Sequence, residues 1–150
     1  LTLCTYFKDS NSYSNPSEYE VYKNRRFAGF GLFSKAMTLY KFGKSQKDIT
    51  ILQACIETLQ IDLKLREEDW KNAKGYSDSR FIHNTSLAES FILEMMAQYL
   101  IYEIEPSADN FNRYFYASEK IKAMQLLETL SPSSLPDALF EKEKISIKAV

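Results

Sequence analysis

The chain has 150 residues, 45% of them apolar and 14% aromatic, which is typical of one globular domain and excludes a disordered segment. Its formal net charge is −1, so no basic excess indicates nucleic acid or an anionic membrane as a partner. The sequence shows no signal peptide and no transmembrane run, and its cysteines, Cys4 and Cys55, lie far apart. These features predict free thiols and a cytoplasmic location.

The first 16 residues are rich in Ser, Asn, Thr and Tyr without any period, and we expect them to be a polar leader or linker. Ser17 and Glu20 have the spacing of a capping box, which predicts that a first helix starts there and reaches about Phe42. Gly43 stands where a helix-ending residue is expected.

Two glycines, Gly29 and Gly31, lie inside this predicted helix, where each costs about 1 kcal/mol relative to Ala. They indicate either a phosphate-binding loop or close helix packing. No strand precedes them and they do not belong to a Gly-x-Gly-x-x-Gly motif, so the sequence favours packing.

A second helix is predicted from about Asp48 to Lys74 and Gly75. Its apolar residues keep the three- and four-residue spacing of an amphipathic helix: Ile49, Leu52, Ile56, Leu59, Leu63 and Trp70. Glu67, Glu68 and Asp69 are expected to form a solvated acidic turn. Residues 75–83 are predicted to be a loop.

The chain is organised around the stretch from Leu87 to Ile104, in which eleven of the last fourteen residues are apolar. Its apolar residues form two faces, Phe91, Met95, Tyr99 and Tyr102 on one and Leu93, Met96, Leu100 and Ile104 on the other. A helix of this kind must be covered on more than one side, so we expect neighbouring helices on both flanks. Asn84 or Ser86 is predicted to cap it, and Glu105-Pro106 to end it.

Ser107 is predicted to start a fourth helix, which ends near Leu130. The residues expected to point inward are Phe111, Tyr114, Phe115, Ala117, Ile121, Met124 and Leu127. After a break at 131–135, residues 136–150 are predicted to form a fifth helix, with Pro136 in its first turn.

These elements predict an all-α fold of about five helices. The helices joined within 17–72 and within 84–130 would form two antiparallel hairpins that share one core. Stacked hairpins, as in a helical solenoid, and a closed four-helix bundle both fit this pattern. The expected organisation is a leader at 1–16, a helical-hairpin domain at 17–135, and a C-terminal helix at 136–150 leading into an absent downstream domain.

The residue types needed for catalysis or for metal binding do not come together in a recognisable pattern. His83 is the single histidine, and Cys55 lies among apolar residues where an inert thiol is expected. Glu89, Glu94 and Glu103 are not joined by the Glu-x-x-His pairs that di-iron bundles need. We therefore expect no catalytic residue, no metal ligand and no cofactor-binding residue in this chain.

Arg66 stands on the apolar stripe between Leu63 and Trp70, so we expect its guanidinium to lie partly inside a seam between helices. One possibility is that the side chain reaches solvent past Trp70. The other is an ion pair with a carboxylate on another helix. Glu119 is the first candidate for that carboxylate, with Glu94 or Glu103 as second choices. The residues predicted to hold the helices together are thus Arg66, Glu119, Trp70, Phe91, Met95 and Tyr99.

Several segments, taken in order, resemble a known family. They are FYASEKIKAMQLLETL at 115–130, SLPDALFEKEKISI at 134–147, ACIETLQIDLKLRE at 54–67 and SRF at 79–81. The succession resembles the helical region that joins tetratricopeptide repeats to the caspase-like CHAT protease domain of bacterial proteins, and it covers about residues 15–150.

The resemblance implies a tetratricopeptide-like scaffold for sensing or partner binding, coupled to a protease domain downstream in the same polypeptide. The family's catalytic His and Cys lie in that protease domain, so no catalytic residue is carried over. Our hypothesis is a non-catalytic interaction domain that binds a protein or peptide along a groove between helices. The alternatives are a small-molecule-binding or enzymatic helical bundle, which would enclose a partly polar pocket, and a structural spacer, which would have no groove.

Overall fold

The computed structural model describes residues 14–17, 21, 23, 25–72 and 77–129. These residues form four helices and no strand: α3 (Arg25–Gln46), α4 (Ile49–Asn72), α5 (Ser77–Ile104) and α6 (Ala108–Thr129). The predicted all-α class is confirmed. The expected fifth helix at 136–150 lies outside the described residues.

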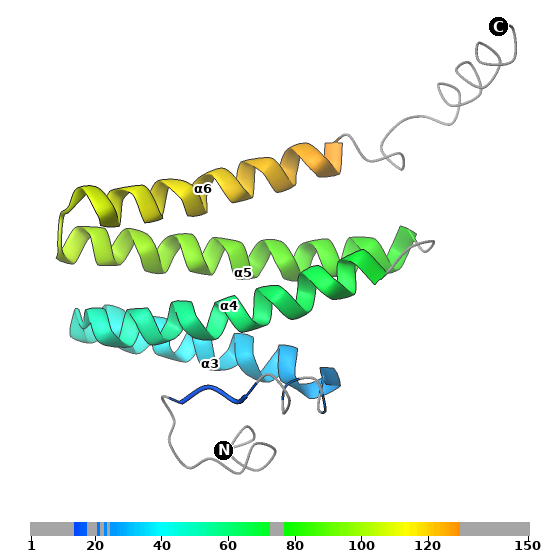
Figure 1. Cartoon of the computed structure of the whole chain (residues 1–150), viewed down its shortest axis with the longest axis horizontal. Coiled ribbons are helices and arrows are strands. Elements are labelled where there is room, and N and C mark those ends of the chain that lie inside the picture. The colour runs from blue at the N-terminus through cyan, green and yellow to red at the C-terminus, as the bar shows by residue number, and fades with distance from the viewer. Residues whose placement is uncertain (1–13, 18–20, 22, 24, 73–76, 130–150) are drawn as a thin grey trace, which may run out of the picture.

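Consecutive helices are neighbours, and the four form a row (Figure 1). The packing runs from α3 to α4, from α4 to α5 and from α5 to α6, which puts α3 and α6 at opposite ends. In a closed four-helix bundle the first and last helices would also pack together. The structure is therefore a stack of two helical hairpins rather than a closed bundle.

The core lies mainly between α3, α4 and α5, and α5 is covered on both flanks as predicted. Leu93, Ala97 and Ile101 of α5 pack with residues of α3 and α4. Phe91 of α5 packs with Leu63 of α4 and with Ile121 of α6. One strip of α5 nevertheless faces solvent and includes Ile92, Met96 and Tyr99. The expectation that the face with Met96 would be covered is wrong at that residue.

The connection between α3 and α4 is shorter than predicted, because α3 continues through Gly43 to Gln46. Lys47 then takes a left-handed conformation with φ 52°, and the amide of Asp48 donates to the carbonyl of Gly43 at 3.0 Å. This is the hydrogen bond of a Schellman cap. The carboxylate of Asp48 caps α4 by accepting from the amide of Thr50 at 2.8 Å.

Gly43 thus does not end the helix but serves packing. A Cβ built on it would lie 2.9 Å from Cγ of Leu52 in α4, closer than carbon atoms normally approach. At Gly29, by contrast, an added Cβ would meet its nearest neighbour at 3.8 Å, an ordinary contact. The close approach predicted for Gly29 therefore occurs at Gly43.

The start of α5 differs from the prediction, because residues 77–83, expected to be a loop, are helical. Asn84 and Ser86 consequently lie inside α5 and cap nothing. The physical reason is that no glycine or proline interrupts the chain between Gly75 and Pro106, so the helix continues toward its N-terminus beyond the apolar stretch.

The joint between α5 and α6 is as predicted. Helix α5 ends at Ile104, just before Glu105 and Pro106. Ser107 caps α6, because its hydroxyl accepts from the amide of Asn110 at 3.1 Å and its carbonyl accepts from the amide of Phe111 at 3.0 Å.

The inward face predicted for α6 is only partly correct. Ala117 is buried, and Tyr114 and Ile121 are half-buried, but Phe111 is 45% and Phe115 51% exposed. In the described part of the chain α6 packs against α5, so one stripe of it is covered. The side chains of Met124 and Leu127 lie outside the described residues.

Among the helices that the structure describes, none combines the length and the apolar character needed to cross a bilayer.

Candidate functional site

The side chain of Arg66 lies in the seam between α3 and α4, with 17% of its surface exposed. Its guanidinium is 5.4 Å from the ring centroid of Phe33 in α3, a cation–π distance. Its Nε donates to Oδ2 of Asp62 at 2.6 Å, so the partner lies one turn earlier on the same helix. The expected burial in a seam is thus found, but the possible ion pair with a carboxylate on another helix is not formed.

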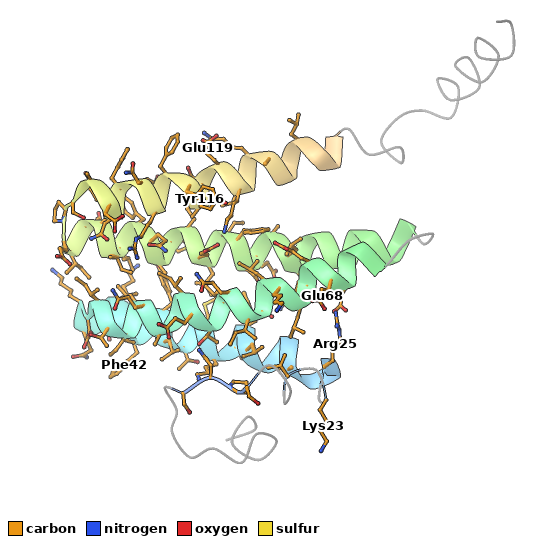
Figure 2. The ribbon with its side chains drawn as sticks, viewed as in Figure 1. Lys23, Arg25, Phe42, Glu68, Tyr116 and Glu119 are labelled. Carbon is orange, nitrogen blue, oxygen red and sulfur yellow. The ribbon has the colours of Figure 1, made fainter. Side chains whose placement is uncertain are left out.

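Glu119 pairs elsewhere, because its carboxylate lies 2.6 Å from Nζ of Lys122 on its own helix. The side chain of Glu119 is 45% exposed, and its helix α6 stands at the far end of the stack from α3 (Figure 2). Since Arg66 points toward α3, it cannot meet a carboxylate on α6. An exposed pair such as Glu119 with Lys122 contributes about 0–1 kcal/mol, so Glu119 holds no helices together.

The residue that does join helices here is Asp62, which the sequence analysis did not single out. Its side chain is fully buried, and the hydroxyl of Ser90 in α5 donates to its Oδ2 at 2.6 Å. The other oxygen, Oδ1, faces Gly29 of α3 and has no hydrogen-bond donor among the described residues. Asp62 thereby links the two hairpins. Its one signal in the sequence was the four-residue spacing to Arg66.

Burial raises the pKa of Asp62 above its usual value of 3.8, because removing a carboxylate from water disfavours its charge. The charge of Arg66 and the hydrogen bonds from Arg66 and Ser90 act in the opposite direction. We call Asp62, Arg66 and Ser90 the central polar cluster.

A second polar contact joins α5 to α6. The side chain of Glu94 is 6% exposed, and its Oε2 lies 3.5 Å from Nζ of Lys120, an ion pair too long for a good hydrogen bond. The same Nζ is 5.8 Å from the ring centroid of Phe91 and 5.0 Å from that of Tyr116. Glu94, considered above as a partner for Arg66, therefore pairs with Lys120.

A third contact closes the N-terminal end of α3 onto α4. Arg25 donates to Asp69 at 2.6 and 2.9 Å, to Glu68 at 3.0 Å and to the carbonyl of Leu65 at 3.2 Å (Figure 2). The acidic residues at 68 and 69, expected to be a solvated turn, thus bind Arg25 across the seam.

The remaining residues predicted to join helices take different places. Phe91 is buried, with 8% of its surface exposed. Met95 is half-buried, and Tyr99 is 42% exposed. Trp70 lies within α4, but its side chain lies outside the described residues. Among those of them whose side chains the structure describes, Phe91 alone is buried.

Aromatic side chains gather along the seam between α5 and α6. The turn at Pro106 sets Tyr102 opposite Phe111 and Tyr99 opposite Tyr114, with ring centroids 5.7 and 5.4 Å apart. Phe111 also stacks on Phe115, with centroids 6.2 Å apart. We call these five residues the α5–α6 aromatic face. The exposure of Tyr99, Phe111 and Phe115 makes this a surface of the kind that proteins use to bind one another.

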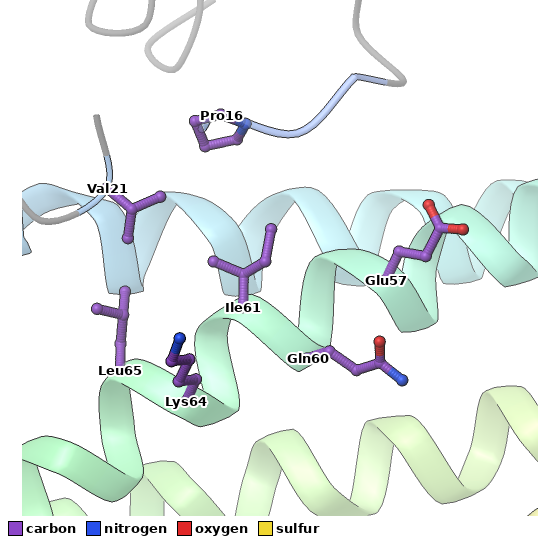
Figure 3. Close-up of a pocket in the computed structure, with 7 residues that line it drawn as sticks. All are labelled: Pro16, Val21, Glu57, Gln60, Ile61, Lys64 and Leu65. Carbon is purple, nitrogen blue, oxygen red and sulfur yellow. The ribbon is translucent and has the colours of Figure 1, made fainter. Parts of the chain in front are cut away.

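A shallow pocket of about 300 Å³ opens beside α4 (Figure 3). Its apolar wall consists of Pro16, Val21, Ile61 and Leu65, and its polar rim of Glu57, Gln60 and Lys64. It belongs to the surface rather than to the interior between the helices. It is therefore not the enclosed, partly polar cavity that a small-molecule-binding bundle would have.

Cys55 does not have the environment of a nucleophile. Its side chain is fully buried, and its thiol lies 3.2 Å from the carbonyl of Ala36. Burial raises the pKa of Cys55 to about 12, so at neutral pH it is a thiol and not the thiolate that attacks substrates. The side chain of His83 lies outside the described residues. Within the part of the chain that the structure describes, no three His, Cys, Asp or Glu residues are placed to hold a metal ion.

Comparisons with protein-family models, with curated proteins and with solved structures find no match to this chain.

Proposed function

We propose that this chain is a non-catalytic helical interaction domain that binds another protein through the α5–α6 aromatic face. The observation that carries the proposal is the exposure of Phe111 and Phe115, about half of each, next to Tyr99 at 42%. Large aromatic side chains contribute strongly when a partner covers them, because each buries a large apolar area at low entropic cost.

The stack itself supports this role. Helix α6 packs on α5 and turns its other sides away from the described helices, so a partner can approach along the whole seam. The alternative, a small-molecule-binding or enzymatic bundle, has the open pocket beside α4 as its support. That pocket is at the small end of the range for ligand sites, roughly 300–1,000 Å³. The aromatic face is the better-supported binding surface.

The resemblance described above supports a narrower proposal, in which the partner or the host polypeptide carries a CHAT-type protease domain and this chain regulates it. The chain would then present its aromatic face to the protease domain or to the protein that activates it. The two parts are separable, because a partner without a protease domain would leave the interaction surface intact and remove the regulatory role.

The test is cross-linking of the purified chain in a bacterial lysate, with identification of the cross-linked proteins by mass spectrometry. We expect Phe111→Ala with Phe115→Ala to lose a partner that the wild-type chain retains. The matched control is Phe42→Ala with Phe30→Ala on α3, because Phe42 is also 45% exposed and lies at the other end of the stack (Figure 2). A partner retained equally by both double variants would contradict the assignment of the surface.

A further inference from the structure

The exposed apolar surface on the second hairpin is wider than the α5–α6 aromatic face. Ile92 and Met96 of α5 are 43% and 38% exposed, and their spacing to Tyr99 puts all three on one side of the helix. The ring of Tyr99 contacts that of Tyr114 in α6, so the apolar surface continues from one helix to the next. We call the exposed apolar residues of this surface the extended face: Ile92, Met96, Tyr99, Phe111 and Phe115.

The extended face has the size of the apolar part of a dimer interface. An aromatic side chain has about 150–250 Å² of surface, so the three half-exposed rings present roughly 300 Å². Ile92 and Met96 bring the total to on the order of 400 Å². A standard interface covers roughly 800 Å² on each partner, a little over half of it apolar. A second copy of the same face is therefore large enough to cover it.

Each helix contributes one stripe to this surface, and each stripe ends in a charged residue. The stripes are Ile92, Met96, Tyr99 and Glu103 on α5, and Phe111, Phe115, Ser118 and Lys122 on α6. Helix α6 runs back antiparallel to α5 (Figure 1). Glu103 therefore lies at the end of the surface next to the joint between the helices, and Lys122 lies at the opposite end, on the neighbouring helix.

This diagonal arrangement of charges is self-complementary about one two-fold axis. When the axis crosses the helices midway along the surface, α5 of one copy lies antiparallel on α5 of the other, and α6 lies likewise on α6. Each end of the interface then receives Glu103 from one copy and Lys122 from the other. Ser118 and Phe115 are equally far from the middle of their stripe, so each ring lies opposite a small side chain. The chain has a net charge of only −1, so two copies repel each other weakly.

We propose that the chain forms a two-fold homodimer through the extended face, which makes a second copy the protein partner and so rests on the function proposed above. Two-fold dimers are the commonest assemblies of identical chains. In the dimer each copy covers the exposed rings of the other, and the two pairs of opposite charges fix the antiparallel orientation.

Sedimentation equilibrium of the purified chain from micromolar to millimolar concentration tests the proposal. We expect the wild type to dimerise reversibly, and Phe111→Ala to raise the dissociation constant at least about tenfold. The matched control is Phe42→Ala on α3, because both side chains are 45% exposed. A wild type that stays monomeric, or equal weakening by the two substitutions, would overturn the proposal.

Charge reversal tests the two-fold arrangement. Glu103→Lys alone and Lys122→Glu alone should each raise the dissociation constant roughly threefold or more, because each puts like charges at both ends of the interface. Both reversals in one chain should restore the wild-type value, because each end again receives one charge of each sign. A double variant that dimerises no better than the single variants would contradict the arrangement and overturn the proposal.

A measurement on the wild type covers the case in which a variant does not fold. In a mixture of chains with and without ¹³C-labelled Met methyl groups, the methyl group of Met96 should show nuclear Overhauser effects to protons of the other copy, and their absence would overturn the homodimer. The failure of the homodimer is distinguishable from that of the proposed function. A monomeric chain that still retains a lysate partner through Phe111 and Phe115 loses the homodimer alone, whereas a monomeric chain without such a partner loses both.

Discussion

At the scale of single residues, the stack depends on a carboxylate that is buried and incompletely bonded. Both donors to Asp62, Arg66 and Ser90, reach its Oδ2, and Oδ1 has no donor among the described residues. A buried charge is costly unless it is paired. The hydrogen bond from Ser90 therefore contributes more to stability than one between two neutral groups would. This bond also crosses from one hairpin to the other.

Replacing Ser90 with Ala should therefore destabilise the chain by roughly 1.5–3 kcal/mol, the range for a hydrogen bond to a charged group. Urea denaturation followed by circular dichroism measures the change in the free energy of unfolding. Ser118→Ala is the matched control, since the hydroxyl of Ser118 donates to the carbonyl of Phe115 in its own helix at an exposed position. Equal effects of the two substitutions would contradict the role assigned to Ser90.

Asp62 should also make the stability depend on pH. Its pKa in the folded chain is raised above the ordinary 3.8 by burial, so the folded state binds the proton more tightly than the unfolded state does. In the window between these two pKa values, the free energy of unfolding contributed by this group must fall as pH rises.

The measurement compares the free energy of unfolding of wild type and Asp62→Asn from acid to neutral pH. We expect the wild type to lose stability relative to the variant as pH rises above about 3.8, and the difference to level off once Asp62 is ionised in both states. If the wild type instead gains stability relative to the variant over this window, the contacts of Asp62 with Arg66 and Ser90 lower its pKa by more than burial raises it.

At the scale of helices, the α3–α4 contact is set by one glycine and one turn. Because Gly43 has no side chain, α4 can approach α3 closely at this point. A Cβ added to Gly43 would lie 2.9 Å from Cγ of Leu52 in α4. Lys47 then reverses the chain in a left-handed conformation, and Asp48 starts the next helix. The reversal at Lys47 thus lies only four residues after the close packing at Gly43.

Gly43→Ala should destabilise the chain by about 1–3 kcal/mol, because overpacking at Leu52 outweighs the better helix propensity of Ala. Gly29→Ala is the control within the same helix, where the added methyl meets its nearest neighbour, Oδ1 of Asp62, at 3.8 Å. For Gly29→Ala we expect no loss of stability, and an increase of up to about 1 kcal/mol in the free energy of unfolding from the better helix propensity of Ala. Thermal unfolding of both variants gives the comparison, and a reversed order would contradict the packing described here.

At the scale of the whole molecule, the open stack makes the helices unequal. Helix α5 has neighbours on two sides, whereas in the described part of the chain α6 packs mainly against α5. An end helix buries less apolar surface and opens at a lower free energy than a central one.

Native-state hydrogen exchange should therefore be faster in α6 than in α5. Ala117 and Ala97 are suitable reporters, because both are buried alanines inside a helix. We expect the amide of Ala117 to exchange at least about tenfold faster than that of Ala97, corresponding to roughly 1.4 kcal/mol in opening free energy. Equal protection would mean that α6 opens together with the rest of the stack or is covered by a partner.

The sequence by itself determined the all-α class, the helix–helix joint at Pro106, the start of the next helix at Ser107, and the covering of α5 on both flanks. These features depend on residues close together in the sequence and on the spacing of the apolar positions. Both can be read from the sequence without knowing the fold. The start of α5 was mispredicted for the same reason, since Asn84 and Ser86 look like local caps and only the continuing helix shows that they are not.

The tertiary structure alone decided which side chains meet. The partner of Arg66, the pairing of Glu94 with Lys120, the exposure of Phe111 and Phe115, and the approach at Gly43 all depend on how each helix is rotated about its axis and on which helix lies beside it. That rotation results from packing over the whole stack, where several apolar faces of similar strength compete. Helical spacing places Arg66 on a stripe, but the neighbouring helix and the nearest buried carboxylate determine what its guanidinium contacts.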